Sequence, residues 1–197
     1  MKLIFASNNA HKVDEIRHLV GQRFELLSLK EAGIFQDIPE PHDTIEANAS
    51  EKSRVIYDLT GENCFSEDTG LEVTALNGAP GVRSARYAGD QKSFDDNIDL
   101  LLKNMEGQVN RTARFKTVIS LILNGQEYLF EGICPGIITH ERLGEQGFGY
   151  DPVFVPDGSD RSFGQMKLAE KEIFSHRSKA THKLVAFLNS LELNQEN

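Results

Sequence analysis

Two adjacent acidic residues, Glu67 and Asp68, follow a short apolar run and precede Thr69 and Gly70. The end of a strand is where an α/β fold presents ligand-facing groups, and a carboxylate there can bind a metal ion or accept a proton. Because successive strand residues point to opposite faces, we expect only one of the two acids to face a given pocket. The competing interpretation is a solvated turn that carries acidic side chains.

A polar loop with a lysine lies near the start of the chain. Residues 3–6 predict a buried strand, residues 7–11 are mostly polar, and Val13, Ile16 and Val20 share one face of a predicted helix. Backbone N–H groups at such a helix start attract anions, and Lys12 could reach the same anion, although a lone lysine is typical of any surface. The segment lacks the Walker and dinucleotide glycine patterns, which argues against a P-loop NTPase and a Rossmann dehydrogenase.

Glu40 is a second carboxylate that could bind a metal ion. It lies between Pro39 and Pro41, and prolines stiffen the backbone on both sides of it. A carboxylate held in a fixed place loses less entropy when it binds a metal. The competing interpretation is an ordinary solvated acidic loop.

Two later segments could recognise a nucleotide. In residues 148–152 (Phe-Gly-Tyr-Asp-Pro) an aromatic ring could stack on a base, the glycine permits close backbone approach, and Asp151 could accept a hydrogen bond from a base or ribose. A packed aromatic turn is the alternative. His176 and Arg177 open the last predicted helix, where the helix dipole disfavours cations unless an anion or carbonyl is bound, and Lys171 lies just upstream.

Composition limits the classes of protein that fit this chain. Its 197 residues suit one domain, or one domain with a smaller lobe, and 39% hydrophobic residues are enough for a core. The net charge of -9 argues against general nucleic-acid binding, which needs a basic surface. We expect no membrane span and no signal peptide, because the apolar runs are too short. Cys64 and Cys134 are expected to be buried free thiols in a reducing cytosol.

The pattern of apolar residues predicts a mixed α/β architecture with a long antiparallel hairpin. Helices are predicted over residues 44–57, 94–105 and 175–191, and strands over residues 64–66 and 71–76. Residues 114–123 and 126–133 predict a hairpin joined by Asn124-Gly125, and residues 136–140 add a further strand. Residues 194–197 are expected to form a loose tail.

Five motifs then occur in a familiar order from Ser7 to Ala180. They are Ser-Asn-Asn-Ala-His-Lys, Glu-Asp-Thr-Gly-Leu, Gly-Ala-Pro-Gly-Val-Arg-Ser-Ala-Arg-Tyr, Phe-Gly-Tyr-Asp-Pro and Ser-His-Arg-Ser-Lys-Ala. In this order the chain resembles the inosine/xanthosine triphosphate pyrophosphatases, which remove noncanonical purine nucleotides. Each motif is weak alone, but five in register are specific. Glu67 stands where many bacterial members carry aspartate, and Thr69 where many carry serine; both changes keep the chemistry.

The resemblance implies a fold, an activity and a site. The fold would be α/β, with a central mixed sheet, flanking helices and two lobes around a nucleotide-binding cleft, and residues 1–197 would form one domain of a cytoplasmic homodimer. The activity would be Mg²⁺-dependent hydrolysis of ITP, dITP and XTP to the monophosphate and pyrophosphate. Asp68 would be the catalytic acid and would hold Mg²⁺ together with Glu40. The implied substrate-binding residues are Ser7, Asn8, Asn9, Ala10, His11, Lys12, Lys52, Thr69, Phe148, Gly149, Tyr150, Asp151, Lys171, His176 and Arg177.

Two other functions stay open at this point. One is a related pyrophosphatase that acts on modified pyrimidines, and the other is a nucleotide sensor that binds ITP without cleaving it. The acidic pair together with Glu40 favours the enzyme, because a mere binder needs no paired metal carboxylates. We expect Lys12 and Lys171 to act mainly on the triphosphate. We also expect Glu67 and Asp68 to be solvated, so that neither contributes much to folding.

Overall fold

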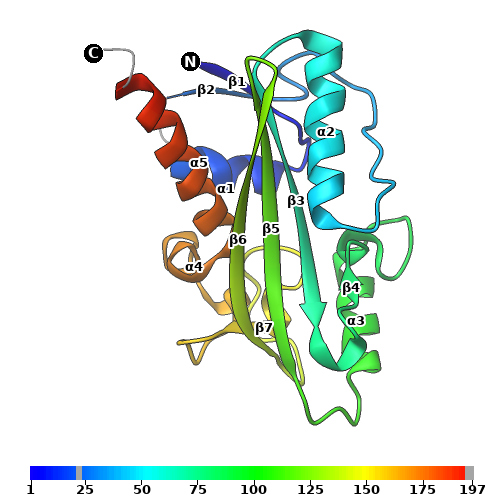
Figure 1. Cartoon of the computed structure of the whole chain (residues 1–197). Helices are drawn as coiled ribbons and strands as arrows, with labels where there is room; N and C mark the ends of the chain where they lie inside the picture. Colours follow the sequence, from blue (N-terminus) through cyan, green and yellow to red (C-terminus); the bar gives the residue numbers. More distant parts are fainter. Residues whose placement is uncertain (21–23, 194–197) are drawn as a thin grey trace. The chain divides into compact units, whose positions relative to one another are not determined.

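The computed structural model describes residues 1–20 and 24–193, and it shows an α/β fold built on a mixed sheet (Figure 1). The strand order is β2-β1-β3-β5-β6-β7, and β4 pairs with β3 outside this path. The strands are β1 (Lys2–Phe5), β2 (Glu25–Ser28), β3 (Cys64–Val73), β4 (Pro80–Gly81), β5 (Thr112–Leu123), β6 (Gln126–Ile138) and β7 (Phe154–Pro156). The helices are α1 (Ala10–Val20), α2 (Ile45–Thr60), α3 (Phe94–Asn104), α4 (Leu168–Phe174) and α5 (His176–Leu193).

The chain divides into two compact units. Unit 1 comprises Met1–Asp68, Thr117–Gly132 and Arg177–Asn197, and unit 2 comprises Thr69–Lys116 and Ile133–His176. Strands β3, β5 and β6 each contribute residues to both units. The expected loose tail, residues 194–197, lies outside the described residues. Within the described part of the chain, no helix is long and apolar enough to cross a membrane.

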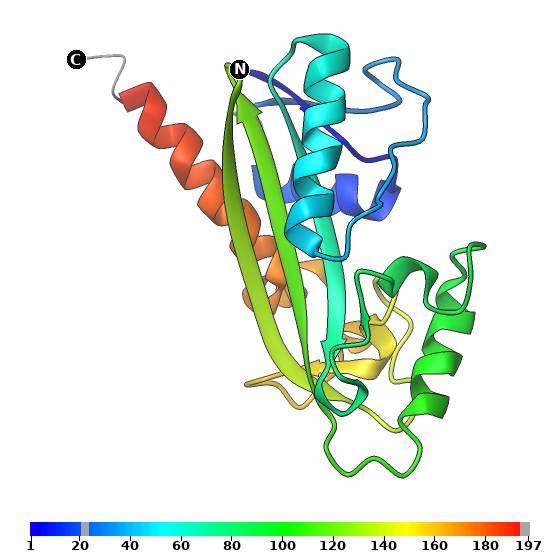
Figure 2. The ribbon, with the colours of Figure 1, turned by 45° about the vertical axis from the view of Figure 1, so that its right-hand side comes forward.

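Unit 1 has three layers, because alternate residues of its strands point to opposite faces. Leu3 and Phe5 of β1 pack with the apolar faces of α1 and α5, whereas Ile4 packs with Ile56 of α2 on the other side. Figure 2 shows α2 against one side of the strands of unit 1. The predicted apolar faces of the first and last helices are confirmed, since both lie in the buried cluster of this unit.

Helix α2 begins and ends at residues suited to these positions. The side chain of Thr44 accepts a hydrogen bond from the backbone N–H of Ala47 at 3.2 Å, which satisfies one free donor of the first turn. Gly61 ends the helix with φ +68°, and its N–H donates to the carbonyl of Tyr57. The predicted helix over residues 44–57 is therefore confirmed, and the structure extends it to Thr60.

The predicted strands near the acidic pair need correction. Residues 64–73 form the single strand β3, so Glu67 and Asp68 lie inside a strand rather than at its end, and residues 74–76 form a 3₁₀ turn. The neighbouring strand β1 stops at Phe5, which pairs with Phe65, so β3 continues beyond its parallel partner. The two acids therefore lie past the end of β1. Similarly, residues 136–138 belong to β6 and form no separate strand.

Unit 2 has its own core, formed by β3, α3, β5, β6 and the segment from Tyr150 to Met166. Ser93 caps α3, and β7 pairs with β6 in antiparallel orientation. Sequence patterns did not predict the short helix α4.

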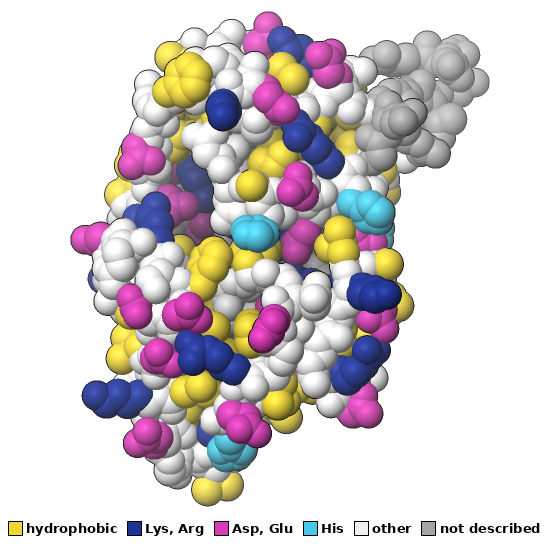
Figure 3. Space-filling view, turned by 180° about the vertical axis from the view of Figure 1, so that it is seen from behind, with side chains coloured by type: hydrophobic (Ala, Val, Ile, Leu, Met, Phe, Trp, Pro, Cys, Tyr) yellow, Lys and Arg dark blue, Asp and Glu magenta, His cyan; other side chains and the backbone are white. Residues whose placement is uncertain are grey.

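Cys64 and Cys134 are buried and free, as predicted, and burial raises the pKa of the Cys64 thiol to about 12. On the face seen in Figure 3, acidic and basic side chains are interspersed.

Candidate active site

A buried lysine in unit 1 binds both predicted metal carboxylates. The Nζ atom of Lys52 donates to Glu40 Oε1 at 2.7 Å, to Asp68 Oδ1 at 2.9 Å and to the carbonyl of Glu67 at 2.9 Å. An ammonium group has three N–H donors, so these contacts use all of them. The side chains of Lys52 and Asp68 are 8% and 9% exposed, whereas that of Glu40 is 26% exposed. The three groups form what we call the carboxylate cluster.

The carboxylate cluster carries more negative than positive charge when both acids are ionised. Burial lowers the pKa of Lys52, but the charges of Asp68 and Glu40 outweigh it and hold that pKa above its usual value. Burial raises the pKa of the Asp68 carboxyl, and Glu40 adds to this effect, while Lys52 and Lys12 oppose it. The carboxyl of Asp68 is therefore a stronger base than an ordinary aspartate. One carboxylate charge remains unbalanced by Lys52, which favours the approach of a cation.

Glu67 faces the opposite side of β3 and belongs to a different network. Its two carboxylate oxygens accept from Arg177 at 2.6 and 2.7 Å, and Lys12 Nζ lies 3.2 Å from Oε1. Arg177 also donates to Glu15 of α1. The predicted alternation of the acidic pair is thus confirmed, because Asp68 faces α2 and Glu67 faces α1 and α5. Burial lowers the pKa of Arg177, but Glu67 and Glu15 outweigh it and raise that pKa overall.

The expectation that both acids are solvated is wrong. Glu67 is only 2% exposed and Asp68 only 7% exposed. The physical reason is that each acid has a buried cation as partner, which compensates for much of the desolvation of its charge. Glu67 is therefore part of the folded interior rather than a surface group.

The predicted triphosphate loop, residues 7–12, leads into α1. The side chain of Asn9 accepts from the N–H of Lys12 at 3.3 Å, and Ser7 Oγ accepts from the N–H of Asn9 at 3.2 Å. These contacts fix the loop at the helix start. His11 is exposed, and the ammonium of Lys12 lies 3.2 Å from Glu67 Oε1.

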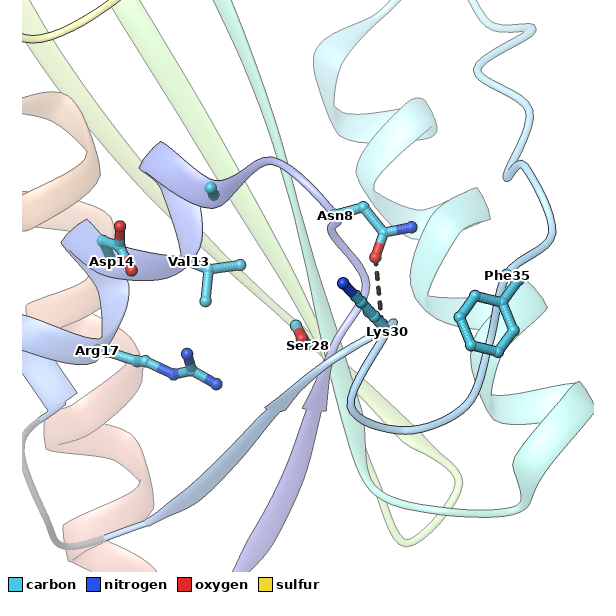
Figure 4. Close-up of a pocket in the computed structure, with 8 residues that line it drawn as sticks. Asn8, Val13, Asp14, Arg17, Ser28, Lys30 and Phe35 are labelled. Carbon is cyan, nitrogen blue, oxygen red and sulfur yellow. Dashed lines mark hydrogen bonds between the residues drawn. The ribbon is translucent and has the colours of Figure 1, made fainter.

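Residues of this loop also line a groove of about 360 Å³ in unit 1 (Figure 4). Asn8 and Ala10 contribute to it, together with Arg17 of α1, Lys30 and the exposed ring of Phe35. Asn8 Oδ1 accepts from the backbone N–H of Lys30 at 3.2 Å. Neither the carboxylate cluster nor the Glu67 network contributes a residue to the lining of this groove.

A second buried lysine–aspartate pair lies in unit 2. Lys171 Nζ donates to Asp151 Oδ2 at 2.7 Å, and both side chains are at most 5% exposed. The same ammonium lies 5.1 Å from the ring centre of Phe148 and 5.5 Å from that of Phe163, within the range of cation–π attraction. Asp151 Oδ2 also accepts from the N–H of Phe148 at 2.9 Å. Ring, carboxylate and ammonium are thus held as one group.

Two glycines in this turn have different roles. Gly149 has φ +60°, and a Cβ there would meet nothing within 4 Å, so the backbone angle is what requires glycine. Gly147 also has a positive φ, +75°, and in addition a Cβ there would lie 2.0 Å from Asp151 Oδ2, which Lys171 holds in place. The hydroxyl of Tyr150 donates to the carbonyl of Ser84 at 2.8 Å, and the ring of His176 stacks on Phe115. The contact of Tyr150 helps to hold the predicted base-binding turn.

The structure brings the predicted residues together in two sets. Unit 1 joins Lys52 to Glu40 and Asp68, and joins Lys12 and Arg177 through Glu67. Unit 2 joins Phe148, Asp151 and Lys171, while Thr69 is half-buried at the start of that unit's part of β3. The guanidinium of Arg177 is bound by two carboxylates, a setting that sequence patterns did not predict.

Glu15 and Asn48 are two buried polar residues of this region that sequence patterns did not identify as part of the site. Glu15 is 8% exposed and lies three positions after Lys12, next to the apolar face of α1. The buried face of α2 is formed by Ile45, Asn48, Ala49, Lys52, Ser53 and Ile56. Asn48 and Lys52 thus occupy positions of a helical face where apolar residues are expected. Polar residues at these otherwise apolar positions are the sequence signal that could have identified Asn48 and Lys52 as site residues.

The oxygen donors of the carboxylate cluster suit a hard divalent cation. Within residues 1–20 and 24–193, no group of three or more His, Cys, Asp or Glu side chains is arranged to hold a metal ion. Mg²⁺ does not need such a cage, because it binds through one or two carboxylates and fills its remaining positions with water and substrate phosphates. Glu40 and Asp68, which converge on one ammonium, provide two such carboxylates.

The chain is similar to known proteins in sequence and in structure. The chain is 49% identical over 190 residues to the dITP/XTP pyrophosphatase of Flavobacterium johnsoniae, covering 96% of this chain and 99% of the relative. The corresponding protein of Porphyromonas gingivalis is 46% identical, with 95% and 97% covered. The Staphylococcus aureus Ham1 protein has a similar structure, with a TM-score of 0.88, 35% identity and 96% and 99% of the two chains covered.

A second solved structure, a HAM1 protein from Coxiella burnetii, has a TM-score of 0.89 at 32% identity, with 96% and 99% covered. The family model described as the Ham1 family matches residues 3–187, nearly the whole chain. The mixed sheet with flanking helices is the architecture of these structures. The chain therefore belongs to the Ham1 family.

Proposed function

We propose that this protein hydrolyses noncanonical purine nucleoside triphosphates to the monophosphate and pyrophosphate. For ITP the reaction is ITP plus water to IMP plus pyrophosphate, which removes the unwanted nucleotide from the pool. The observation that carries the proposal is the convergence of Glu40 and Asp68 on Lys52 in a member of the Ham1 family. Relatives that are 41–50% identical carry the name dITP/XTP pyrophosphatase, which supports the choice of substrate.

Glu40 and Asp68 are the residues that would hold Mg²⁺. The ion would neutralise charge on the phosphate oxygens of the substrate. Asp68 orients the attacking water and accepts its proton at a carboxylate oxygen, a role helped by its raised pKa. Lys12 stabilises the charge of the departing pyrophosphate, and Lys52 keeps the two carboxylates together before substrate binds. No covalent intermediate is needed.

The set in unit 2 suits the nucleoside part of the substrate. The ring of Phe148 can stack on a purine, while Asp151 and Lys171 supply an acceptor and a donor for polar groups of base or ribose. Because Lys171 is paired with Asp151 and its ammonium lies near two aromatic rings, its setting favours the nucleoside over the triphosphate. Hypoxanthine and xanthine carry an oxygen at position six, whereas adenine carries an amino group that would oppose a donor.

By the family resemblance, we propose that residues 1–197 act as one functional domain. We also propose a homodimer, by the family resemblance, and a cytoplasmic location. The cytoplasmic proposal is supported by two buried free cysteines, which are typical of proteins in a reducing compartment.

An assay of pyrophosphate release tests this proposal. ITP, XTP, dITP, GTP and ATP are each supplied with and without Mg²⁺, and kcat/KM is measured for every nucleotide. We expect ITP, dITP and XTP to be preferred, and turnover to require the metal. Similar kcat/KM for ATP and ITP would contradict the assignment. Preference for a modified pyrimidine would favour the related pyrophosphatase, and binding of ITP without pyrophosphate release would favour a sensor.

A further inference from the structure

Asn48 holds the loop that carries Glu40. Its side chain is 2% exposed and lies one helical turn before Lys52 on the buried face of α2. The Oδ1 atom accepts from the backbone N–H of His42 at 2.9 Å, and the Nδ2 group donates to the carbonyl of His42 at 3.0 Å. One amide therefore binds both polar backbone groups of a single residue. We call this pair of contacts the Asn48 clamp.

The loop is anchored on both sides of Glu40. His42 lies two residues after Glu40 and is held by the Asn48 clamp, while Ile38 lies two residues before it and packs against the apolar cluster beside α2. Pro39 and Pro41 restrict the backbone between these anchors. The carboxylate of Glu40 therefore has little freedom beyond its own side-chain rotations.

We propose that Asn48 is a positioning residue for the divalent cation, because the clamp keeps the carboxylate of Glu40 close to that of Asp68. This inference rests on the proposed role of Glu40 and Asp68 as metal ligands. Two carboxylates repel each other, and Lys52 balances only one of the two charges, so the anchored loop acts together with Lys52 in holding Glu40 near Asp68. Holding the backbone in place reduces the ordering that metal binding must otherwise supply.

Unit 2 contains a matched control for this clamp. Asn97 of α3 is 3% exposed, accepts from the N–H of Ala88 at 2.7 Å and donates to the carbonyl of Ala85 at 3.1 Å. It is also a buried helical asparagine that binds the backbone of a preceding loop. Its loop carries neither predicted metal carboxylate. If such a clamp only supports the fold, substitution of Asn48 and substitution of Asn97 should therefore change metal binding alike.

The test measures Mn²⁺ binding to the metal-free full-length protein by electron paramagnetic resonance. We expect Asn48→Ala to raise the Kd for Mn²⁺ by about 10-fold, the low end for a group that orients a metal ligand. Asn97→Ala should leave this Kd unchanged. His42→Ala should also leave it unchanged, because the clamp binds backbone atoms that alanine retains. Thermal unfolding of each variant reports the loss of stability separately.

A second measurement uses the reaction itself. The Mg²⁺ concentration for half-maximal pyrophosphate release from ITP should rise about 10-fold in Asn48→Ala, while kcat at saturating Mg²⁺ stays close to that of the unchanged protein. If Asn48→Ala does not fold, Asn48→Leu fills a similar volume without the two hydrogen bonds and should give the same shift.

Different results separate the two proposals. An Asn48 variant that loses stability with no change in the Mn²⁺ Kd would overturn the positioning role. Equal weakening of Mn²⁺ binding by Asn48→Ala and Asn97→Ala would also overturn it, since both would then act through general loosening. If Glu40→Gln and Asp68→Asn leave Mn²⁺ binding intact, the metal assignment itself fails. Weakening by these two carboxylate variants but not by Asn48→Ala would reject only the clamp.

Discussion

Each unit contains one buried lysine–aspartate pair, and the two pairs have different surroundings. Lys52 and Asp68 in unit 1 share their contact with a second carboxylate, Glu40. Lys171 and Asp151 in unit 2 form an ion pair whose ammonium lies over the ring of Phe148. The ammonium–carboxylate distances are similar, 2.9 Å in the pair of unit 1 and 2.7 Å in the pair of unit 2. The pair of unit 1 has an additional carboxylate beside it, and the pair of unit 2 has aromatic rings.

This difference shows that the neighbours of an ion pair decide what it can bind. The excess carboxylate of unit 1 favours a cation, whereas the balanced pair of unit 2 can offer one donor and one acceptor to a neutral polar ligand. A ring beside the pair adds a surface for stacking. Metal and phosphate chemistry are therefore expected in unit 1 and recognition of the base in unit 2.

The largest effect on catalysis is expected when the aspartate of each pair is replaced by asparagine. Asp68→Asn removes negative charge and basicity with little change in size, so kcat for ITP should fall by at least about 10²-fold. Asp151→Asn should act mainly through KM, because it alters binding of the nucleoside. Steady-state kinetics of both variants with ITP would measure this split. The opposite pattern would reverse the roles assigned to the two pairs.

Glu67→Gln tests whether the network behind β3 supports the fold. Glu67 is buried and holds the guanidinium of Arg177, so the substitution should lower the free energy of unfolding by about 3 kcal/mol, the low end for breaking a buried pair. Glu72→Gln in unit 2 is the control, since the side chain of its partner Arg114 is 49% exposed and surface pairs contribute about 1 kcal/mol or less. Urea unfolding would compare them; equal losses would contradict the structural role of Glu67.

A smaller effect is expected when the aromatic ring of unit 2 is removed. Phe148→Leu should raise KM for ITP by about 10-fold, within the range measured for base stacking. Mn²⁺ binding should not change, because the ring has no part in the carboxylate cluster. Phe35→Leu removes an exposed ring from the groove of unit 1 and should leave KM unchanged. Identical KM values for both variants would remove Phe148 from the base site.

The smallest effect concerns the pKa of Asp68 in the metal-free protein. Glu40 is one cause of the raised pKa, because its negative charge disfavours a second ionised carboxyl nearby. Glu40→Gln should therefore lower the pKa of Asp68, while Lys12→Met should raise it further. Carbon-13 NMR titration of the Asp68 carboxyl would measure both shifts. A shift of the same sign in both variants would show that direct charge effects do not dominate.

Much of the fold follows from local patterns. The apolar face of the last helix, the cap at Thr44 and the hairpin turn at Asn124-Gly125 all depend on residues close together in sequence, and the structure contains each of them. The full length of β3 could not be predicted, because its polar residues from Ser66 to Gly70 interrupt the apolar run and pairing with distant strands decides where it ends.

The residue types and spacing of the candidate site were visible in the sequence, but their partners were not. The amino-acid sequence by itself determined the Ham1 family motifs, the alternation that turns Glu67 away from Asp68, and the prolines around Glu40. Only the tertiary structure decided that Lys52 joins the two predicted metal carboxylates and that Arg177 is held by Glu67, 110 positions earlier. Such contacts depend on how helices pack on a sheet, and that packing brings together residues whose separation in sequence carries no local signal.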